Sequence, residues 1–207
     1  MAGLSGYIFM GINDNERDTI LWNQFKNGIN NSFTVIFTNY YPGLFTYGSK
    51  FTADKHLVED CIQELFLDMW RTKGRGDIIS LKAYIFTAFK FKLIKLIAKS
   101  NKVKTIVAYN DENAFDLSHE NFLITNEQHA AVKEKLRFAI SELSPRQKEI
   151  IYLKFYVDLS YEEVSNIMGI NYQASRNLIY QSIKVLKKII PFHLIFVFLF
   201  KQFNIQG

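Results

Sequence analysis

Four side chains able to bond to or stack on DNA bases follow soon after Gly169: Tyr172, Gln173, Arg176 and Asn177. Helix positions three or four residues apart are neighbours, so this spacing places the four side chains on one surface. Glutamine and asparagine amides can pair with adenine through two hydrogen bonds, and the arginine guanidinium can pair with guanine in the same way. The stretch therefore indicates the reading of base edges in duplex DNA.

Two helices joined by a tight turn are expected to position these side chains. Ser160 and Glu163 have the spacing of a capping box, which predicts the start of a short helix. This helix should end at Gly169, where the chain turns through a positive φ. Asn171 can cap the next helix, expected over 172–189. Helix, glycine turn and helix are typical of the helix-turn-helix, whose second helix enters the major groove.

An ordinary helical hairpin with a solvated polar side would share part of this pattern. A further capping box, formed by Ser144 and Gln147 around Pro145, precedes the first one. Two consecutive boxes before the glycine turn favour DNA binding over the hairpin. Lys184 lies farther along the second helix, where it can reach a phosphate. Many helix-turn-helix units carry a branched apolar residue where this chain has Ser175, which predicts looser contacts of the second helix.

A second candidate surface lies in the first half of the chain, on a helix expected over 56–70. Asp60, Gln63 and Glu64 share the side opposite to its apolar residues. An acidic, amide-bearing face taken alone is most often only solvated. Beside a DNA-binding domain it indicates a protein partner.

The helix that follows carries the opposite charge. Ser80 is its expected N-cap, with Ile79 and Tyr84 as a hydrophobic staple, and lysines line its outer side. Phe91 beside these lysines suits stacking on unpaired bases, worth ~1–3 kcal/mol per base; contact with a neighbouring helix is an equal alternative. The candidate residues on this helix and on the basic, glycine-containing loop before it are Arg71, Lys73, Arg75, Lys82, Phe91, Lys92, Lys95 and Lys99.

The periodicity predicts an all-α protein made of two small helical domains. Apolar residues recur at helical spacing along the chain, without the sustained alternation typical of strands. Two further helices are expected early on, one starting near Asp18 and one over 31–40, ending ahead of Pro42. The expected organisation is a first domain over 16–100, a flexible linker over 101–126, a helix-turn-helix domain over 127–190 and an apolar tail over 191–207.

Composition narrows the classes of function. The 25 Lys and Arg exceed the 20 Asp and Glu, and the net charge of +5 permits a polyanionic partner. The single cysteine, Cys61, excludes an intramolecular disulfide framework and fits a reducing compartment. The histidines are scattered, and we find no glycine-rich phosphate loop and no recognisable carboxylate pair. The sequence therefore predicts no catalysis, no metal, no cofactor and no small-molecule substrate.

The apolar tail bears on location. It is shorter than the ~20 apolar residues that a membrane-spanning helix needs, and no secretory signal is recognised. We expect a cytoplasmic protein whose tail forms a helix that covers an apolar groove or meets a partner.

Taken together, the two halves resemble the extracytoplasmic-function (group 4) sigma factors of the sigma-70 superfamily, in a variant most similar to those of Bacteroidetes-type bacteria. Segment 60–70 resembles their polymerase-binding segment, and segment 80–86 the one that leads into their promoter-melting helix. Their C-terminal promoter-reading domain is similar to segments 143–147, 159–163 and 169–173. The resemblance covers about residues 18–190, in the expected order and separation.

The resemblance implies a region 2-like and a region 4-like domain that direct core RNA polymerase, through its beta-prime and beta subunits, to promoter DNA. It implies that Asp60, Gln63 and Glu64 meet the clamp helices of the beta-prime subunit. The loop over 71–79 and the helix of Lys92 and Lys95 would open the minus-ten element and capture a non-template base. An inhibitory anti-sigma factor, able to hold the protein at the inner membrane, is implied as a further partner.

Reading of the minus-thirty-five element by Gln173, Arg176 and Asn177 is implied in the same way. The common family pattern has Asn and Asp where this chain has Phe91 and Lys95, so its minus-ten contacts cannot be carried over to this chain. The apolar tail also lies outside the common core.

The leading hypothesis is thus a promoter-specificity subunit whose two weak DNA contacts, tethered by a linker, become effective together on the polymerase. The alternative is a stand-alone helix-turn-helix regulator with an effector domain over 16–100. That regulator would bind an operator without polymerase, as a dimer. A nucleic-acid enzyme is a third class, against which the missing catalytic motifs count.

Overall fold

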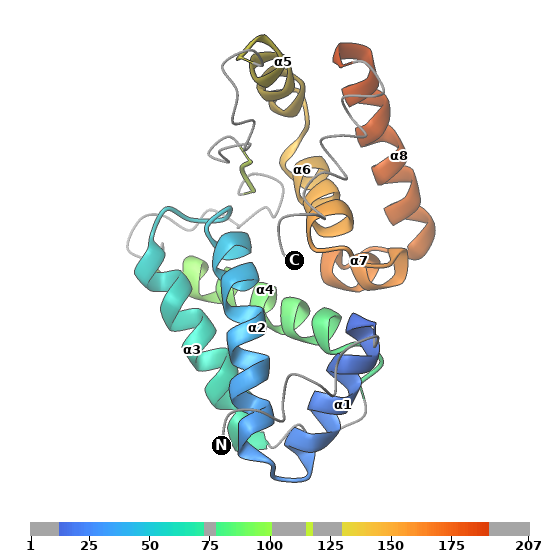
Figure 1. Ribbon diagram of the computed structural model, residues 1–207. Coiled ribbons are helices and arrows are strands. Elements are labelled where there is room, and N and C mark those ends of the chain that lie inside the picture. The colour runs from blue at the N-terminus through green and yellow to red at the C-terminus, as the bar shows by residue number, and fades with distance from the viewer. Residues whose placement is uncertain (1–12, 73–77, 101–114, 118–129, 191–207) are drawn as a thin grey trace. The chain divides into compact units, whose positions relative to one another are not determined.

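The computed structural model describes residues 13–72, 78–100, 115–117 and 130–190, and every regular element within these ranges is helical. The chain divides into two compact units. The first holds α1 to α4, and the second holds α5 to α8 together with residues 50–53 (Figure 1). The predicted all-α fold of two small helical domains is confirmed.

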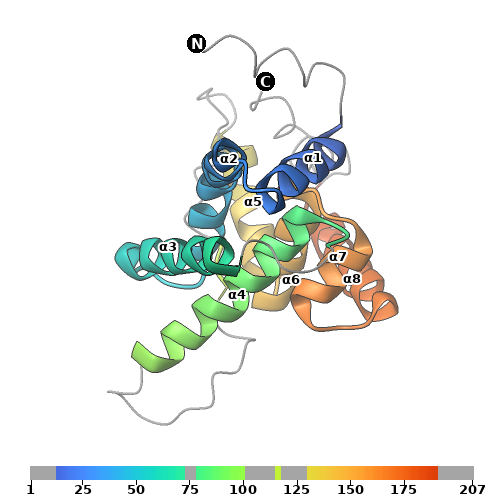
Figure 2. The ribbon, with the colours of Figure 1, turned by 90° about the horizontal axis from the view of Figure 1, so that it is seen from below.

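The first unit consists of α1 (Asp14–Lys26), α2 (Asn30–Gly48), α3 (Lys55–Thr72) and α4 (Leu81–Ser100). α2 packs against α1 and α3, while α4 packs against the other three helices. Figure 2 shows α4 crossing this unit from α3 toward α1. The long α4 therefore has one side on the core and one side free to carry function.

α1 begins four residues before the predicted start near Asp18. The side chain of Asn13 accepts a hydrogen bond from the backbone N–H of Glu16 at 2.9 Å, which caps the helix there. The predicted start was wrong because this polar cap lies ahead of the first apolar residues of the helix, Ile20 and Leu21.

α2 runs through Pro42, whereas the sequence predicted an end before it. A proline inside a helix removes one backbone hydrogen bond and costs about 3 kcal/mol. Buried side chains stand on both sides of Pro42, including Ile36 and Tyr40 before it and Leu44 and Tyr47 after it. Their contacts with neighbouring helices offset that cost, so the prediction was wrong because tertiary contacts override local propensity.

The core of this unit contains a buried polar pair between α1 and α2. The Tyr40 hydroxyl donates a hydrogen bond to the Asp18 carboxylate. Burial raises the pKa of Asp18, although the hydrogen bond from Tyr40 opposes this shift. Burial likewise raises the pKa of the Tyr40 hydroxyl. The pair ties two helices together at the cost of holding a carboxylate away from water.

The start of α4 departs from the prediction in one respect. Ser80 Oγ accepts a hydrogen bond from the backbone N–H of Ala83 at 3.2 Å, which agrees with its expected role as the N-cap. Ile79 is fully exposed and cannot form the expected staple with Tyr84. Tyr84 instead packs against Trp22 of α1, with ring centroids 5.6 Å apart.

The second unit contains α5 (Ala130–Ser141), α6 (Pro145–Ile151), the π-helical turn η4 (Tyr152–Tyr156), α7 (Tyr161–Met168) and α8 (Tyr172–Ile189). α8 packs against α5, α6 and α7. The capping box of Ser144 and Gln147 and that of Ser160 and Glu163 are both formed as predicted. The π-helical turn η4 was not predicted from the sequence.

Only residues 115–117 of the predicted linker belong to the described part of the chain. Phe115 and Leu117 are buried, and Phe115 packs against Tyr152 with ring centroids 5.7 Å apart. The Lys148 ammonium lies 3.6 Å from the Asp116 carboxylate. This short piece is therefore part of the second unit's core. The apolar tail over 191–207 falls outside the described residues, so its expected helix is untested.

Candidate nucleic-acid interface

The outer side of α3 presents the three residues that the sequence singled out for a protein partner. Asp60, Gln63 and Glu64 are exposed, whereas the neighbouring positions Cys61 and Ile62 are fully buried. Burial raises the pKa of the Cys61 thiol to about 12, so this cysteine stays protonated and serves as core. We refer to Asp60, Gln63, Glu64 and the adjoining exposed Asp68 as the acidic surface of α3.

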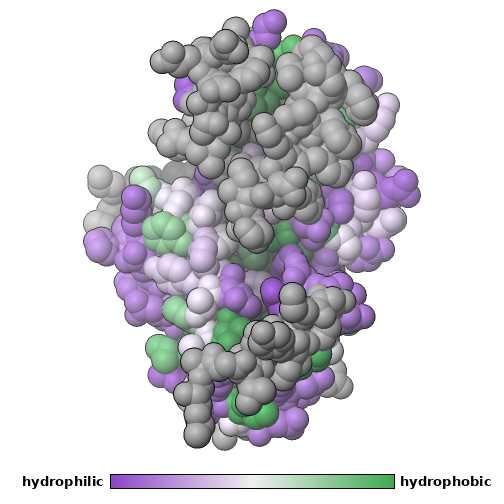
Figure 3. Space-filling view, viewed as in Figure 1, coloured by the Kyte–Doolittle hydropathy of each residue, from purple (hydrophilic) through white to green (hydrophobic). Residues whose placement is uncertain are grey.

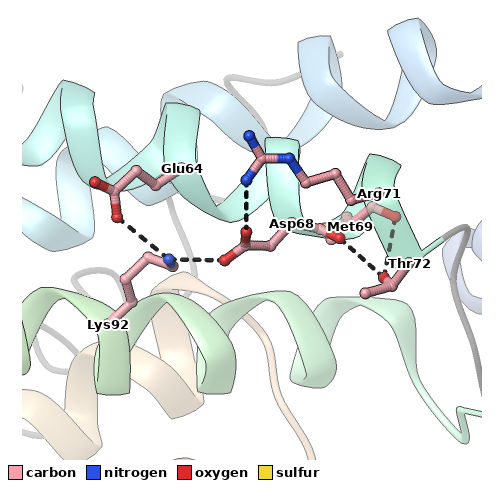
Figure 4. A network of polar contacts seen from close by, with 6 residues as sticks. All are labelled: Glu64, Asp68, Met69, Arg71, Thr72 and Lys92. Atoms are coloured by element: carbon pink, nitrogen blue, oxygen red, sulfur yellow. Dashed lines mark hydrogen bonds and ion pairs between the residues drawn. The ribbon is translucent and has the colours of Figure 1, made fainter.

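Lys92 of α4 lies against this acidic surface. Figure 4 shows its ammonium between two carboxylates, 3.3 Å from Glu64 Oε2 and 2.9 Å from Asp68 Oδ2. The Arg71 guanidinium approaches Asp68 from the other side, at 3.7 Å. The hydrogen bond from Lys92 lowers the pKa of Asp68, and the hydrogen bond to Asp68 raises the pKa of Lys92. Both groups are therefore charged at neutral pH.

This arrangement differs from the sequence prediction for α4, which placed Lys92 in one outer row with the other lysines. Lys92 turns toward α3, while Phe91, Lys95 and Lys99 are exposed to solvent. Phe91 is 59 % exposed, so most of its side chain faces solvent and is not buried against a neighbouring helix. We refer to these three exposed residues as the outer face of α4.

The structure says less about the other residues of this region that were predicted to contact DNA. Lys82 is half-buried near the start of α4, and Arg71 is exposed with its partner Asp68. Lys73 and Arg75 lie outside the described residues.

In the second unit, α7 and α8 form the predicted helix-turn-helix. Gly169 ends α7 with a φ of 63°, and a Cβ built there would meet nothing within 4 Å. The backbone conformation, and not lack of space, therefore selects glycine. Asn171 caps α8 by accepting the N–H of Ala174 at 2.8 Å. Hydrophilic residues cover most of the described surface on the side seen in Figure 3, and apolar ones appear as separate small patches.

Ser175 turns out to suit the crossing of the two helices. It is fully buried, and its hydroxyl donates to the Tyr172 carbonyl at 2.7 Å and approaches the Tyr161 carbonyl at 3.4 Å. A branched apolar side chain could not make these bonds. The expectation of looser contacts at this position was wrong, because a small hydroxyl lets α8 approach the start of α7.

The predicted base-reading residues are exposed on the first turns of α8, as is Lys184 farther along. The Gln173 amide donates to the Asn177 side-chain oxygen at 3.1 Å, so these two side chains hold each other. The Arg176 guanidinium lies over the Tyr172 ring, 5.8 Å from its centroid. These contacts order the side chains on the surface of α8.

Two residues that the sequence reasoning missed support Tyr172. The Tyr161 ring meets the Tyr172 ring edge-on, with centroids 6.1 Å apart. The Lys154 ammonium lies 5.0 Å from the Tyr161 centroid and donates to the Leu159 carbonyl at 2.6 Å. Lys154 belongs to η4, and nothing in the local sequence indicated that this turn would place its side chain near the Tyr161 ring.

Other kinds of site receive no support from the described residues. No group of three or more His, Cys, Asp or Glu side chains within them is arranged to hold a metal ion. None of the helices in these ranges has the length and apolar character needed to cross a bilayer.

Comparison with known proteins accounts for both units. Residues 36–103 match the family described as Sigma-70 region 2, and residues 133–186 match Sigma-70, region 4. The chain is 25 % identical over 152 residues to the ECF RNA polymerase sigma factor SigM of Bacillus subtilis (strain 168), covering 73 % of this chain and 91 % of that protein. It is also 25 % identical over 167 residues to the ECF RNA polymerase sigma factor BldN of Streptomyces coelicolor, covering 77 % of this chain and 61 % of BldN.

Two solved structures share the fold. CnrH, in complex with the cytosolic domain of CnrY, superposes with a TM-score of 0.54 at 17 % identity, over 83 % of this chain and 95 % of CnrH. The sigma factor RpoE of Bartonella quintana, in complex with the anti-sigma factor NepR, gives 0.52 at 16 % identity, over 76 % of this chain and 95 % of RpoE. With region 2 in its first half and region 4 in its second, the chain is an RNA polymerase sigma factor that directs promoter-specific initiation.

Proposed function

We propose that this sigma factor is of the extracytoplasmic-function (group 4) type, as its motifs and its similarity to SigM and BldN suggest. The Bacteroidetes-type assignment rests on the motifs alone and belongs to the same proposal. One observation carries the proposal: the same chain exposes the acidic surface of α3 and, on the first turns of α8, the residues predicted to read bases. In this proposal the first unit binds the protein partner and one promoter element, and the second unit binds the other element.

In this proposal the acidic surface of α3 binds the clamp helices of the beta-prime subunit. Asp60 is exposed and offers a carboxylate to a basic partner. Gln63 adds an amide that can donate and accept hydrogen bonds. Charged pairs across an interface raise the association rate and fix its register.

The outer face of α4 acts on the minus-ten element in this proposal. Phe91 provides an exposed ring on which an unstacked base can lie, and Lys95 and Lys99 provide charge for the adjoining phosphates. The loop that precedes α4, with Lys73 and Arg75, completes this contact in the proposal. The first turns of α8 read the minus-thirty-five element from the major groove, with Lys184 on a phosphate.

An anti-sigma factor is proposed as an inhibitory partner. The support is that RpoE, which shares the fold, was solved with the anti-sigma factor NepR. A test is to compare the chain with a version lacking residues 191–207, by solubility and by capture of an inhibitor. Equal behaviour of the two versions would remove the apolar tail from this proposal.

Reconstituted transcription tests the main proposal. Core RNA polymerase, fragmented genomic DNA and the purified chain are combined, and transcript 5′ ends are sequenced. New start sites that require both the chain and core enzyme are expected, and they should share two upstream elements. Absence of such starts with a competent core enzyme contradicts the proposal. A gel shift without polymerase tests the stand-alone regulator, which the family matches do not favour.

A further inference from the structure

We infer that Lys92 is a positioning residue shared between polymerase docking and DNA binding. In the free protein its ammonium holds Glu64 and Asp68. When a basic partner takes these carboxylates, Lys92 is released toward the nucleic acid on the outer face of α4. The inference rests on the proposed docking role of α3 and adds a coupling that this role does not itself contain.

The position of Lys92 makes it a link between the two surfaces. It extends from α4 to the acidic surface of α3, and it directly follows Phe91 and precedes Lys95 by less than one turn. A lysine has a flexible four-carbon stem and a single compact charge. Rotation of this stem can therefore carry the ammonium from the carboxylates to a phosphate beside Phe91 without any movement of the helix.

The ion pairs are of the exchangeable kind. The Lys92 side chain is 25 % exposed, and the Glu64 and Asp68 side chains are 54 % and 53 % exposed. Pairs open to water contribute only ~0–1 kcal/mol, because solvent and salt screen them. A basic partner can compete with such a pair, whereas it could not extract a lysine from a dry core.

The charges around Lys92 predict the direction in which each affinity should change when its charge is removed. Asp60, Glu64 and Asp68 bring three negative charges to this part of the surface, while Lys92 and Arg71 bring two positive ones. Removal of the Lys92 charge doubles the net negative charge that an approaching cationic partner meets. Docking should become tighter, while DNA binding should become weaker because a cation is lost next to Phe91.

The test uses the full-length chain and two binding measurements on each variant. Affinity for core polymerase is measured by fluorescence titration, and affinity of the reconstituted holoenzyme for a randomised single-stranded DNA probe by anisotropy. Lys92→Gln should bind core polymerase about two- to fivefold more tightly at low salt. It should bind the DNA probe more weakly, and the gain in polymerase binding should fade at high salt.

Matched variants separate coupling from general charge effects. Lys92→Arg keeps the charge and should behave like the parent in both measurements. Lys95→Gln removes one charge from the same helix without touching α3, so only DNA binding should fall. Lys135→Gln, an exposed lysine of the second unit, should alter neither measurement.

A purely structural bridge between α3 and α4 gives a different result. In that case Lys92→Gln would lower the thermal midpoint and weaken both measurements together, which would overturn the inference. Glu64→Ala tells this failure from failure of the proposed function. If Glu64→Ala weakens polymerase binding but Lys92→Gln does not strengthen it, only the coupling is wrong; if Glu64→Ala has no effect, the docking surface itself is wrong.

Discussion

The first unit (α1 to α4) and the second unit (α5 to α8) hold their candidate functional side chains by different means. We call them the docking unit and the recognition unit after their proposed roles. On α8 most contacts that fix the exposed residues lie within a few positions of one another: Asn171 caps the helix, Gln173 bonds to Asn177, and Tyr172 lies under Arg176. The exception is the contact of Tyr172 with Tyr161 of α7. On α3 and α4 the surfaces depend on residues 24 to 28 positions apart in the sequence, through Lys92 and its two carboxylates.

These two kinds of contact predict how far the effect of a single substitution should extend. A capping box or a left-handed glycine acts on one helix end, and its loss is felt mainly within that turn. Contacts between helices are shared, so the loss of one side chain is felt by every helix that it touches. The docking unit should therefore respond to single changes more broadly than the recognition unit does.

The largest expected effect is on the core of the docking unit. Trp22 of α1 is buried and packs against Phe25 and against Tyr84 of α4. Trp22→Ala should destabilise the unit by about 3–5 kcal/mol, because it leaves a large cavity. Hydrogen exchange followed by mass spectrometry should show protection lost in α1 to α4 and retained in α6 to α8.

Trp70 offers a matched control with the same chemistry. It is 42 % exposed, although its ring lies 4.9 Å from that of Phe33. Trp70→Ala should therefore cost less than half as much as Trp22→Ala, since less surface was removed from water. Equal losses of protection in both units after Trp22→Ala would show that the units do not respond separately.

The same contrast explains what could be predicted from the sequence. Both capping boxes, the turn at Gly169 and the exposed residues on the first turns of α8 were predicted, because each signal lies within a few residues. The continuation of α2 through Pro42 was not, because the buried residues that offset its cost contact other helices. A single sequence shows that a proline destabilises a helix, but it does not show which tertiary contacts offset that cost.

Lys92 is the clearest case of a contact that could not be predicted from the sequence. From the helical spacing alone, Lys92 could face solvent together with the other lysines of α4. Only the packing of α3 against α4 brings the Glu64 and Asp68 carboxylates within reach of its ammonium. Lys154 was missed because the π-helical turn that carries it was not predicted, and its contact with the Tyr161 ring joins that turn to α7. The order of the helices was therefore predictable, but the pairing of charges across them was not.

A smaller and more local effect is expected at the cap of α7. Ser160 Oγ accepts the Glu163 N–H at 3.2 Å, and the Glu163 carboxylate accepts the Ser160 N–H at 2.7 Å. Ser160→Ala should cost about 1 kcal/mol, measured by denaturant unfolding, because the backbone N–H of Glu163 loses its acceptor. Ser160→Thr keeps the hydroxyl and should stay within a few tenths of a kcal/mol of the parent, about the cost of a neutral change. A loss of several kcal/mol would mean that the cap acts beyond its own turn.

Another effect should depend on pH in the docking unit. Because the pKa of Asp18 is raised in the folded state, the fold binds its proton more tightly than the unfolded chain does. This contribution is fully present below the ordinary pKa near 3.8 and is lost as pH rises through the raised folded value.

Asp18→Asn tests this pH dependence. The amide oxygen can still accept from the Tyr40 hydroxyl, and no charge is buried. As the pH rises above the ordinary pKa near 3.8, the parent should lose unfolding free energy relative to the variant. Denaturant titrations at several pH values measure this difference, and a difference that does not change with pH would contradict the raised pKa.

The smallest expected effect tests whether local order on α8 matters for DNA binding. Tyr172→Leu removes the ring beneath Arg176 and keeps an apolar side chain against Tyr161. An exposed cation–π contact is worth about 0.5–1 kcal/mol, so binding of the holoenzyme to a selected promoter should weaken about two- to fivefold. Tyr172→Phe keeps the ring and should retain the affinity. If the phenylalanine variant is as weak as the leucine variant, the hydroxyl itself contacts DNA, and Arg176 does not depend on the ring for its position.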